Sequence, residues 1–120
     1  WERGNRDSRK QIDPESLPAP VLSAPLNTES LQEALGEAYT VLSLEGCSLE
    51  SVLYFVSRGN PVIVKLSETE SAVMVGYDPS NTILYYPALG EAKYYPSDDS
   101  RELFEENGNV FITYLENETE

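Results

Sequence analysis

Residues 72–77 constrain the fold more than any other stretch of the chain, because Ala-Val-Met-Val-Gly-Tyr is an almost continuous apolar run. A strand with one solvated face alternates apolar and polar side chains, so this run is typical of a central strand covered on both faces. A second strand is predicted over residues 61–66, where Pro61 stands first and its missing N–H does least harm. The turn at residues 78–81, Asp-Pro-Ser-Asn, leads into a hairpin partner over residues 82–86. These segments predict the middle of an antiparallel sheet.

Two helices are predicted before this sheet from their capping residues and apolar spacing. Ser48 can cap a helix that ends at Gly59, and its apolar stripe consists of Leu49, Val52, Leu53 and Val56. Asn27 or Thr28 can cap an earlier helix, whose apolar residues at three- and four-residue spacing are Leu31, Ala34, Leu35, Ala38 and Tyr39.

The remaining elements follow the hairpin. Residues 92–95 and 110–115 are predicted as short strands, and residues 97–107 as a short helix that begins with two acids and stops at Gly108. The predicted fold class is therefore α+β: an antiparallel sheet of four to five strands, with two N-terminal helices and a short helix before the last strand.

The chain divides into three parts. Residues 1–26 contain four prolines and no sustained hydrophobic period, which predicts an extended linker or arm. Residues 27–116 are predicted to form one folded domain, and residues 117–120 a C-terminal tail. Within the arm, residues 19–26 are expected to lie against the domain as an ordered strap, through Val21, Leu22 and Leu26.

Charge is unevenly distributed along the chain, whose formal net charge is -13. Four of the eight basic residues lie in the first ten positions, whereas all but two of the 21 carboxylates come later. A surface this acidic repels phosphate groups, which argues against nucleic acid and against direct binding to a membrane surface. The charge serves solubility, or else it recruits basic peptides.

Three segments together resemble the second half of the double-glycine leader peptidases, a papain-like group of cysteine peptidases. They read Ser48-Leu-Glu-Ser-Val-Leu-Tyr-Phe-Val-Ser-Arg-Gly-Asn-Pro-Val-Ile-Val, then Ala72-Val-Met-Val-Gly-Tyr-Asp, then Ile83-Leu-Tyr-Tyr-Pro-Ala-Leu-Gly. The resemblance covers residues 48 to about 115 and implies a half-papain-like fold. It also implies a location on the surface of a bacterium or in a secreted protein.

The catalytic base of that family is a histidine, and this chain contains no histidine. Counting back from Gly76, the resemblance places Glu70 at the position of the base, or Ser71 after a one-residue slip. It places Tyr86, which precedes Pro87, where an aspartate would orient the base. A glutamate carboxyl, with an ordinary pKa of about 4.3, cannot replace an imidazole near neutral pH.

Cys47 does not stand where the family has its nucleophile, since it is only 23 residues before Glu70. A cysteine just before a helix can be activated by the helix dipole, but no cationic residue lies nearby in sequence. A packed structural thiol is the expectation, and a reactive thiol is the alternative. With one cysteine, the chain forms no internal disulfide.

No cofactor or metal site is predicted. The chain has no calcium-binding loop of EF-hand type, and Asp98, Asp99 and Glu102 are interpreted as the start of a helix. Gly76 and Gly90 are isolated glycines, so no loop is suited to cradle a phosphate.

Adjacent tyrosines occur twice, at Tyr85-Tyr86 and Tyr94-Tyr95. Because side chains alternate along a strand, each pair must place one ring on either face of the sheet. An exposed aromatic patch of Tyr85, Tyr94 and Tyr95 is one hypothesis, and the ordinary strand preference of tyrosine is the alternative.

The function expected from these observations is that of a non-catalytic domain of a larger protein, which binds a peptide or protein segment near Glu70, Ser71 and Tyr86. The segment could belong to another domain of the same polypeptide. A purely structural spacer or assembly domain is the alternative. An active cysteine peptidase, completed by a histidine from a partner, is a third reading.

Overall fold

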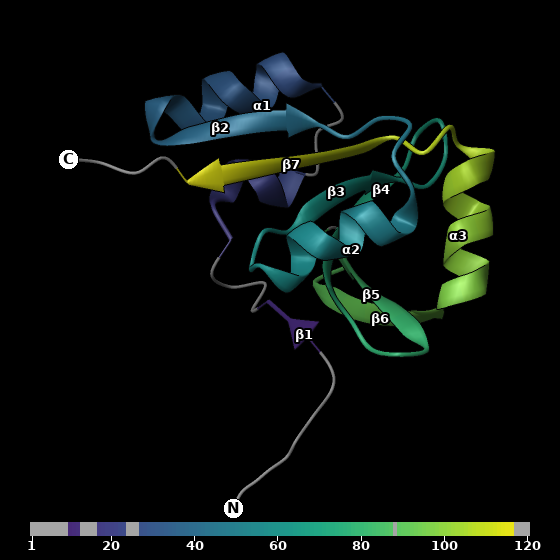
Figure 1. Ribbon diagram of the computed structural model, residues 1–120. Coiled ribbons are helices and arrows are strands. Elements are labelled where there is room, and N and C mark those ends of the chain that lie inside the picture. Colours follow the sequence, from purple (N-terminus) through teal and green to yellow (C-terminus); the bar gives the residue numbers. More distant parts are fainter. Residues whose placement is uncertain (1–9, 13–16, 24–26, 88, 117–120) are drawn as a thin grey trace, which may run out of the picture.

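The computed structural model describes residues 10–12, 17–23, 27–87 and 89–116, and these residues form one antiparallel sheet with helices on both faces (Figure 1). The strands lie in the order β2-β7-β3-β4-β5-β6, and a two-residue strand, β1, also pairs with β4. Their bounds are β1 Lys10–Gln11, β2 Tyr39–Ser43, β3 Val62–Lys65, β4 Ser71–Tyr77, β5 Asn81–Tyr86, β6 Glu91–Pro96 and β7 Phe111–Glu116. The apolar run of residues 72–77 is therefore a central strand, as expected.

Three α-helices accompany the sheet: α1 Thr28–Leu35, α2 Leu49–Ser57 and α3 Ser97–Glu106. The predicted caps are confirmed, since Asn27 Oδ1 accepts hydrogen bonds from the N–H groups of Glu29 and Ser30, and Ser48 Oγ accepts one from Ser51. Gly59 ends the turn after α2 with a φ of +89°, which favours glycine.

The predicted number of strands, four to five, is wrong because β1 and β2 were not expected. The first helix was expected to reach Tyr39, but Gly36 has a φ of +82° and interrupts it after Leu35. A 3₁₀ turn, η3 (Gly36–Ala38), then leads into β2, where Tyr39 is a strand residue.

The Gln32 side chain supports this turn from α1 into β2. Its Nε2 donates to the carbonyl oxygens of Gly36 and Tyr39, at 3.0 and 2.8 Å, and its Oε1 accepts from the N–H of Val41 at 2.9 Å. The amide thus bonds to the outer edge of β2 as a neighbouring strand would.

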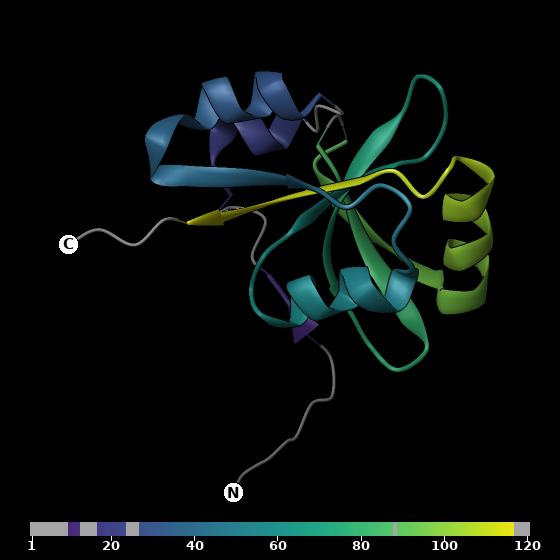
Figure 2. The same ribbon diagram turned by 45° about the horizontal axis from the view of Figure 1, so that its top comes forward.

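The sheet separates two hydrophobic clusters. On one side, here called the α2/α3 face, residues of α2 and α3 pack on Met74 and Leu84. On the other, here called the α1 face, Leu31 of α1 and Val21 pack on Ile63, Val73 and neighbouring residues. Figure 2 shows α1 and α2 on opposite sides of the strands. The central strands are buried on both faces for this reason.

Part of the N-terminal arm packs on the α1 face. A 3₁₀ segment, η2 (Ala19–Ser23), buries Val21 completely, and Leu17 before it is also buried. The strap expected over residues 19–26 is thus present as far as residue 23, while Leu26 lies outside the described residues. Most of the remaining arm and the tail at 117–120 also lie outside them.

Candidate functional site

Glu70 and Ser71 lie where the turn after β3 enters β4. The carbonyl oxygen of Glu70 accepts hydrogen bonds from the N–H groups of Leu66 and Ser67, at 2.9 and 3.2 Å, which fixes the turn. The Glu70 side chain is exposed, whereas Ser71 is half-buried and pairs with Lys65 of β3. A carboxylate is therefore presented to solvent at this end of the sheet.

Tyr86 ends β5 at the same end of the sheet, because Val73 of β4 pairs with Tyr85. Its hydroxyl lies 2.5 Å from the hydroxyl of Tyr95 in β6, and the two rings are edge to face with centroids 6.4 Å apart. The ammonium group of Lys93 lies 5.3 Å from the centroid of the Tyr86 ring.

Burial raises the pKa of the Tyr86 hydroxyl well above its usual value of 10, and the hydrogen bond and charge of Tyr95 and the charge of Glu70 raise it further. The register places Glu70, which precedes β4, and Tyr86, which ends β5, at the same end of neighbouring strands, although the two are far apart in sequence. Because its pKa is raised, Tyr86 remains a neutral hydroxyl at ordinary pH. It can donate and accept hydrogen bonds, but it cannot supply the negative charge with which a carboxylate orients a base.

The tyrosines of the two adjacent pairs divide between the two faces, as their alternation predicts. Tyr86 and Tyr95 pack against the α2/α3 face, and Tyr85 packs against the α1 face. Tyr94 pairs with Ile83, which belongs to the α1 face, and it is 46% exposed. The hypothetical patch of Tyr85, Tyr94 and Tyr95 is therefore not assembled on one face, because Tyr95 points to the other.

Cys47 lies in the turn that precedes α2. Its N–H donates to the carbonyl oxygen of Leu44 at 3.0 Å, and the thiol is half-buried and free of any disulfide.

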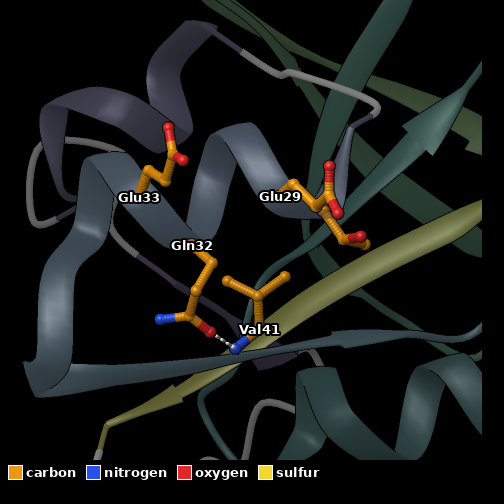
Figure 3. Close-up of a pocket in the computed structure, with 5 residues that line it drawn as sticks. Glu29, Gln32, Glu33 and Val41 are labelled. Atoms are coloured by element: carbon orange, nitrogen blue, oxygen red, sulfur yellow. Dashed lines mark hydrogen bonds between the residues drawn. The ribbon is translucent and has the colours of Figure 1, made fainter.

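Two hollows lie away from Glu70 and Tyr86. The larger, of about 430 Å³, is lined by Thr28, Glu29, Gln32, Glu33 and Val41, between α1 and β2. Figure 3 shows the glutamates pointing away from β2 while Gln32 bonds to Val41. A smaller one, of about 170 Å³, lies at the end of β7. Sequence reasoning missed both because each depends on β2.

Groups that could hold a metal ion, with three or more His, Cys, Asp or Glu residues, are absent from the described part of the chain. Within the same residues, no helix has both the length and the apolar character needed to cross a membrane.

Comparison with known proteins gives one informative match. No family model matches the chain, and no curated protein does. A solved structure from Bacillus anthracis, described as a C39-like peptidase, superposes with a TM-score of 0.63 at 18% sequence identity. The match covers 77% of this chain and 58% of that chain. C39 peptidases are the double-glycine leader peptidases, so the resemblance found in the sequence is confirmed at the level of the fold. The chain has an α+β fold similar to part of such a peptidase.

Proposed function

We propose that this chain is a non-catalytic domain with a C39-peptidase-like fold, and that it binds a peptide at the Glu70–Tyr86 corner, defined by Glu70, Ser71 and Tyr86. The observation that carries the proposal is the hydroxyl pair of Tyr86 and Tyr95, with Tyr86 at the end of the sheet where Glu70 leads into β4. The resemblance implies the position of a base at Glu70 and the position of the carboxylate that orients it at Tyr86.

Loss of catalysis follows from the chemistry of the residues at this corner. A cysteine peptidase needs a thiolate and an imidazole that returns the proton to the leaving group. The chain has no histidine, and Tyr86 is held as a neutral hydroxyl by burial and by Tyr95. The chain therefore offers no imidazole for the proton transfers, and position 86 offers no carboxylate to orient one.

Peptide binding is supported by the polar groups that remain. The Glu70 carboxylate is exposed, and the Lys93 ammonium group lies over the Tyr86 ring. These groups provide acceptors and donors for the N–H and C=O groups of a bound polypeptide. The acidic chain favours a basic or neutral peptide over an acidic one. On the resemblance alone, we place the domain within a larger bacterial surface or secreted protein.

Selection from a library of short random peptides displayed on phage tests the proposal. Peptides enriched on the native chain should bind at least about fivefold more weakly to Glu70→Gln and Tyr86→Phe, because each removes one polar group from the corner. Glu33→Gln is the matched control, since Glu33 is an exposed glutamate on α1. Enriched peptides that bind both corner variants as tightly as the native chain would place the binding site elsewhere. Failure to enrich any peptide would contradict the proposed function.

A structural role is the second candidate, and the edge strand β6 favours it. Residues 91–94 of β6 are exposed, and β6 is the last strand of the sheet order. An exposed strand edge can pair with a strand of another domain. If the assembly role is the main one, substitution of Ala92 by proline should abolish association with the parent protein while leaving peptide binding intact.

A further inference from the structure

Two tyrosines and a glutamate share one face of the sheet where β2 meets the end of β7. Tyr39 pairs directly with Glu116 across the two strands, and Tyr114 lies two residues before Glu116 and so points to the same side. The Tyr39 and Tyr114 rings pack edge to face, with centroids 5.5 Å apart and an interplanar angle of 81°. Both rings belong to the α1 face.

These residues line the hollow of about 170 Å³ at the end of β7, together with Asn60, Pro61 and Leu17 among others. Pro61 precedes β3 and Glu70 follows it, so the hollow and the Glu70–Tyr86 corner lie at opposite ends of that strand. The space holds roughly the terminal part of one long side chain rather than a peptide segment. It is therefore suited to a single group.

The charges around the hollow define the chemistry of that group. Glu116 is exposed and contributes a carboxylate, and none of the described residues that line the hollow is basic. Burial, followed by the influence of Tyr39, raises the pKa of the Tyr114 hydroxyl above its usual value. The Tyr114 hydroxyl therefore stays neutral, and the residue is only 7% exposed. Among the described residues that line the hollow, Glu116 thus supplies the charge that a ligand meets.

We propose that this hollow, the Tyr39–Tyr114 pocket, binds the ammonium or guanidinium group of a lysine or arginine side chain from a partner peptide. Aromatic rings attract cations through their quadrupole, and a neighbouring carboxylate adds the charge that holds one. The acidic chain around it favours a basic partner over a neutral one. The pocket does not depend on the Glu70–Tyr86 corner, and either site could fail without the other.

Titration of the full ¹⁵N-labelled chain with short capped peptides tests the pocket. The probes are acetyl-Gly-Lys-Gly-amide and acetyl-Gly-Arg-Gly-amide, with acetyl-Gly-Gln-Gly-amide as the neutral control. The cationic peptides should give saturable shifts of the amide signals of Tyr39, Asn60 and Glu116, and the glutamine peptide should not. Equal shifts with all three peptides, or no shifts, would overturn the proposal.

Substitutions identify the groups that bind. Glu116→Gln and Tyr39→Leu should each weaken binding about threefold or more, whereas Tyr39→Phe, which keeps the ring, should bind nearly as well as the native chain. Because Glu116 is exposed at the end of a strand, Glu116→Gln keeps the test valid if Tyr39→Leu fails to fold. Glu106→Gln, an exposed acid on α3, is the control. Unchanged affinity in Glu116→Gln would overturn the assignment.

The basic N-terminal segment of the chain itself is the alternative occupant of the Tyr39–Tyr114 pocket. The same titration distinguishes this segment from an external peptide. Arg3, Arg6 and Arg9 can be replaced together by glutamine. If an external peptide is the ligand, this variant should bind the lysine peptide with unchanged affinity. Tighter binding, with shifted pocket signals before any peptide is added, would show that the segment occupies the pocket and would overturn the proposal of a separate partner.

Discussion

The hydroxyl groups of Tyr86 and Tyr95 lie 2.5 Å apart on the α2/α3 face. Tyr86 pairs with Glu91 and Tyr95 with Thr82, so the two side chains reach toward each other along neighbouring strands. In a chain without histidine, the resemblance to the leader peptidases predicts that Tyr86 stands where an aspartate would orient the catalytic base.

The first prediction concerns the Tyr86–Tyr95 hydrogen bond. Tyr86→Phe should lower the free energy of unfolding by about 1 kcal/mol, because the Tyr95 hydroxyl loses its partner in a half-buried position. Urea unfolding measures this loss. Tyr54→Phe is the control, since Tyr54 is 58% exposed, and it should cost less than half as much. The double variant Tyr86→Phe/Tyr95→Phe should cost less than the sum of the single ones, and strict additivity would argue against the bond.

The second prediction is a loss of stability at alkaline pH. The pKa values of Tyr86 and Tyr114 are raised in the folded state, mainly by burial, so folding favours their protonated forms. Their stabilising effect is fully present below about pH 10, where unfolded tyrosine titrates, and declines as the pH rises toward the folded pKa values. The free energy of unfolding should therefore decrease less between pH 8 and a pH above 10 in Tyr86→Phe than in the native chain. An identical pH dependence in the two would contradict the raised pKa of Tyr86.

The third prediction concerns the attachment of α3 to the sheet. Ser100 and Thr82 are fully buried, and their hydroxyls lie 2.7 Å apart. Ser100→Ala should cost about 1–3 kcal/mol, since it leaves the Thr82 hydroxyl buried without this partner. The double variant Thr82→Val/Ser100→Ala removes both groups and should cost less than the two single substitutions added together. Ser80→Ala, at an exposed turn, is the control for thermal and urea unfolding.

The fourth prediction concerns Gln32 and the edge of β2. Gln32→Glu replaces the Nε2 donor by an oxygen that faces the carbonyl groups of Gly36 and Tyr39, which should cost about 1–3 kcal/mol. The repulsion should displace the carboxylate from β2, so the amide hydrogen of Val41 loses its acceptor and should exchange with solvent markedly faster. Glu33→Gln changes the neighbouring exposed residue and should leave that exchange rate unchanged. Slow exchange at Val41 in both variants would contradict the displacement of the side chain from β2.

Local signals in the sequence account for the elements that were predicted correctly. Ser48 and Asn27 cap their helices through short-range hydrogen bonds, and Gly59 adopts the conformation that glycine tolerates best. The alternation of side chains placed Tyr86 and Tyr85 on opposite faces without any knowledge of their neighbours. Such features depend only on residues a few positions apart.

The missed features depend on contacts between distant residues. The spacing of Leu35, Ala38 and Tyr39 continues that of a helix, so nothing local indicates that Tyr39 begins a strand. The partner of β2 is β7, which inserts between β2 and β3 from the far end of the chain. The Tyr39–Tyr114 pocket exists only because of that pairing, and the Tyr86–Tyr95 bond depends on the register of the last hairpin.

The most direct test of the central claim is mass spectrometry of a selected peptide after prolonged incubation with the full chain at neutral pH. If the domain binds the peptide at the Glu70–Tyr86 corner without cleaving it, the peptide should be recovered at full length. The result must hold at peptide concentrations that saturate the domain. Cleavage of the peptide by the native chain, abolished in Cys47→Ser, would contradict the claim and identify an active cysteine peptidase.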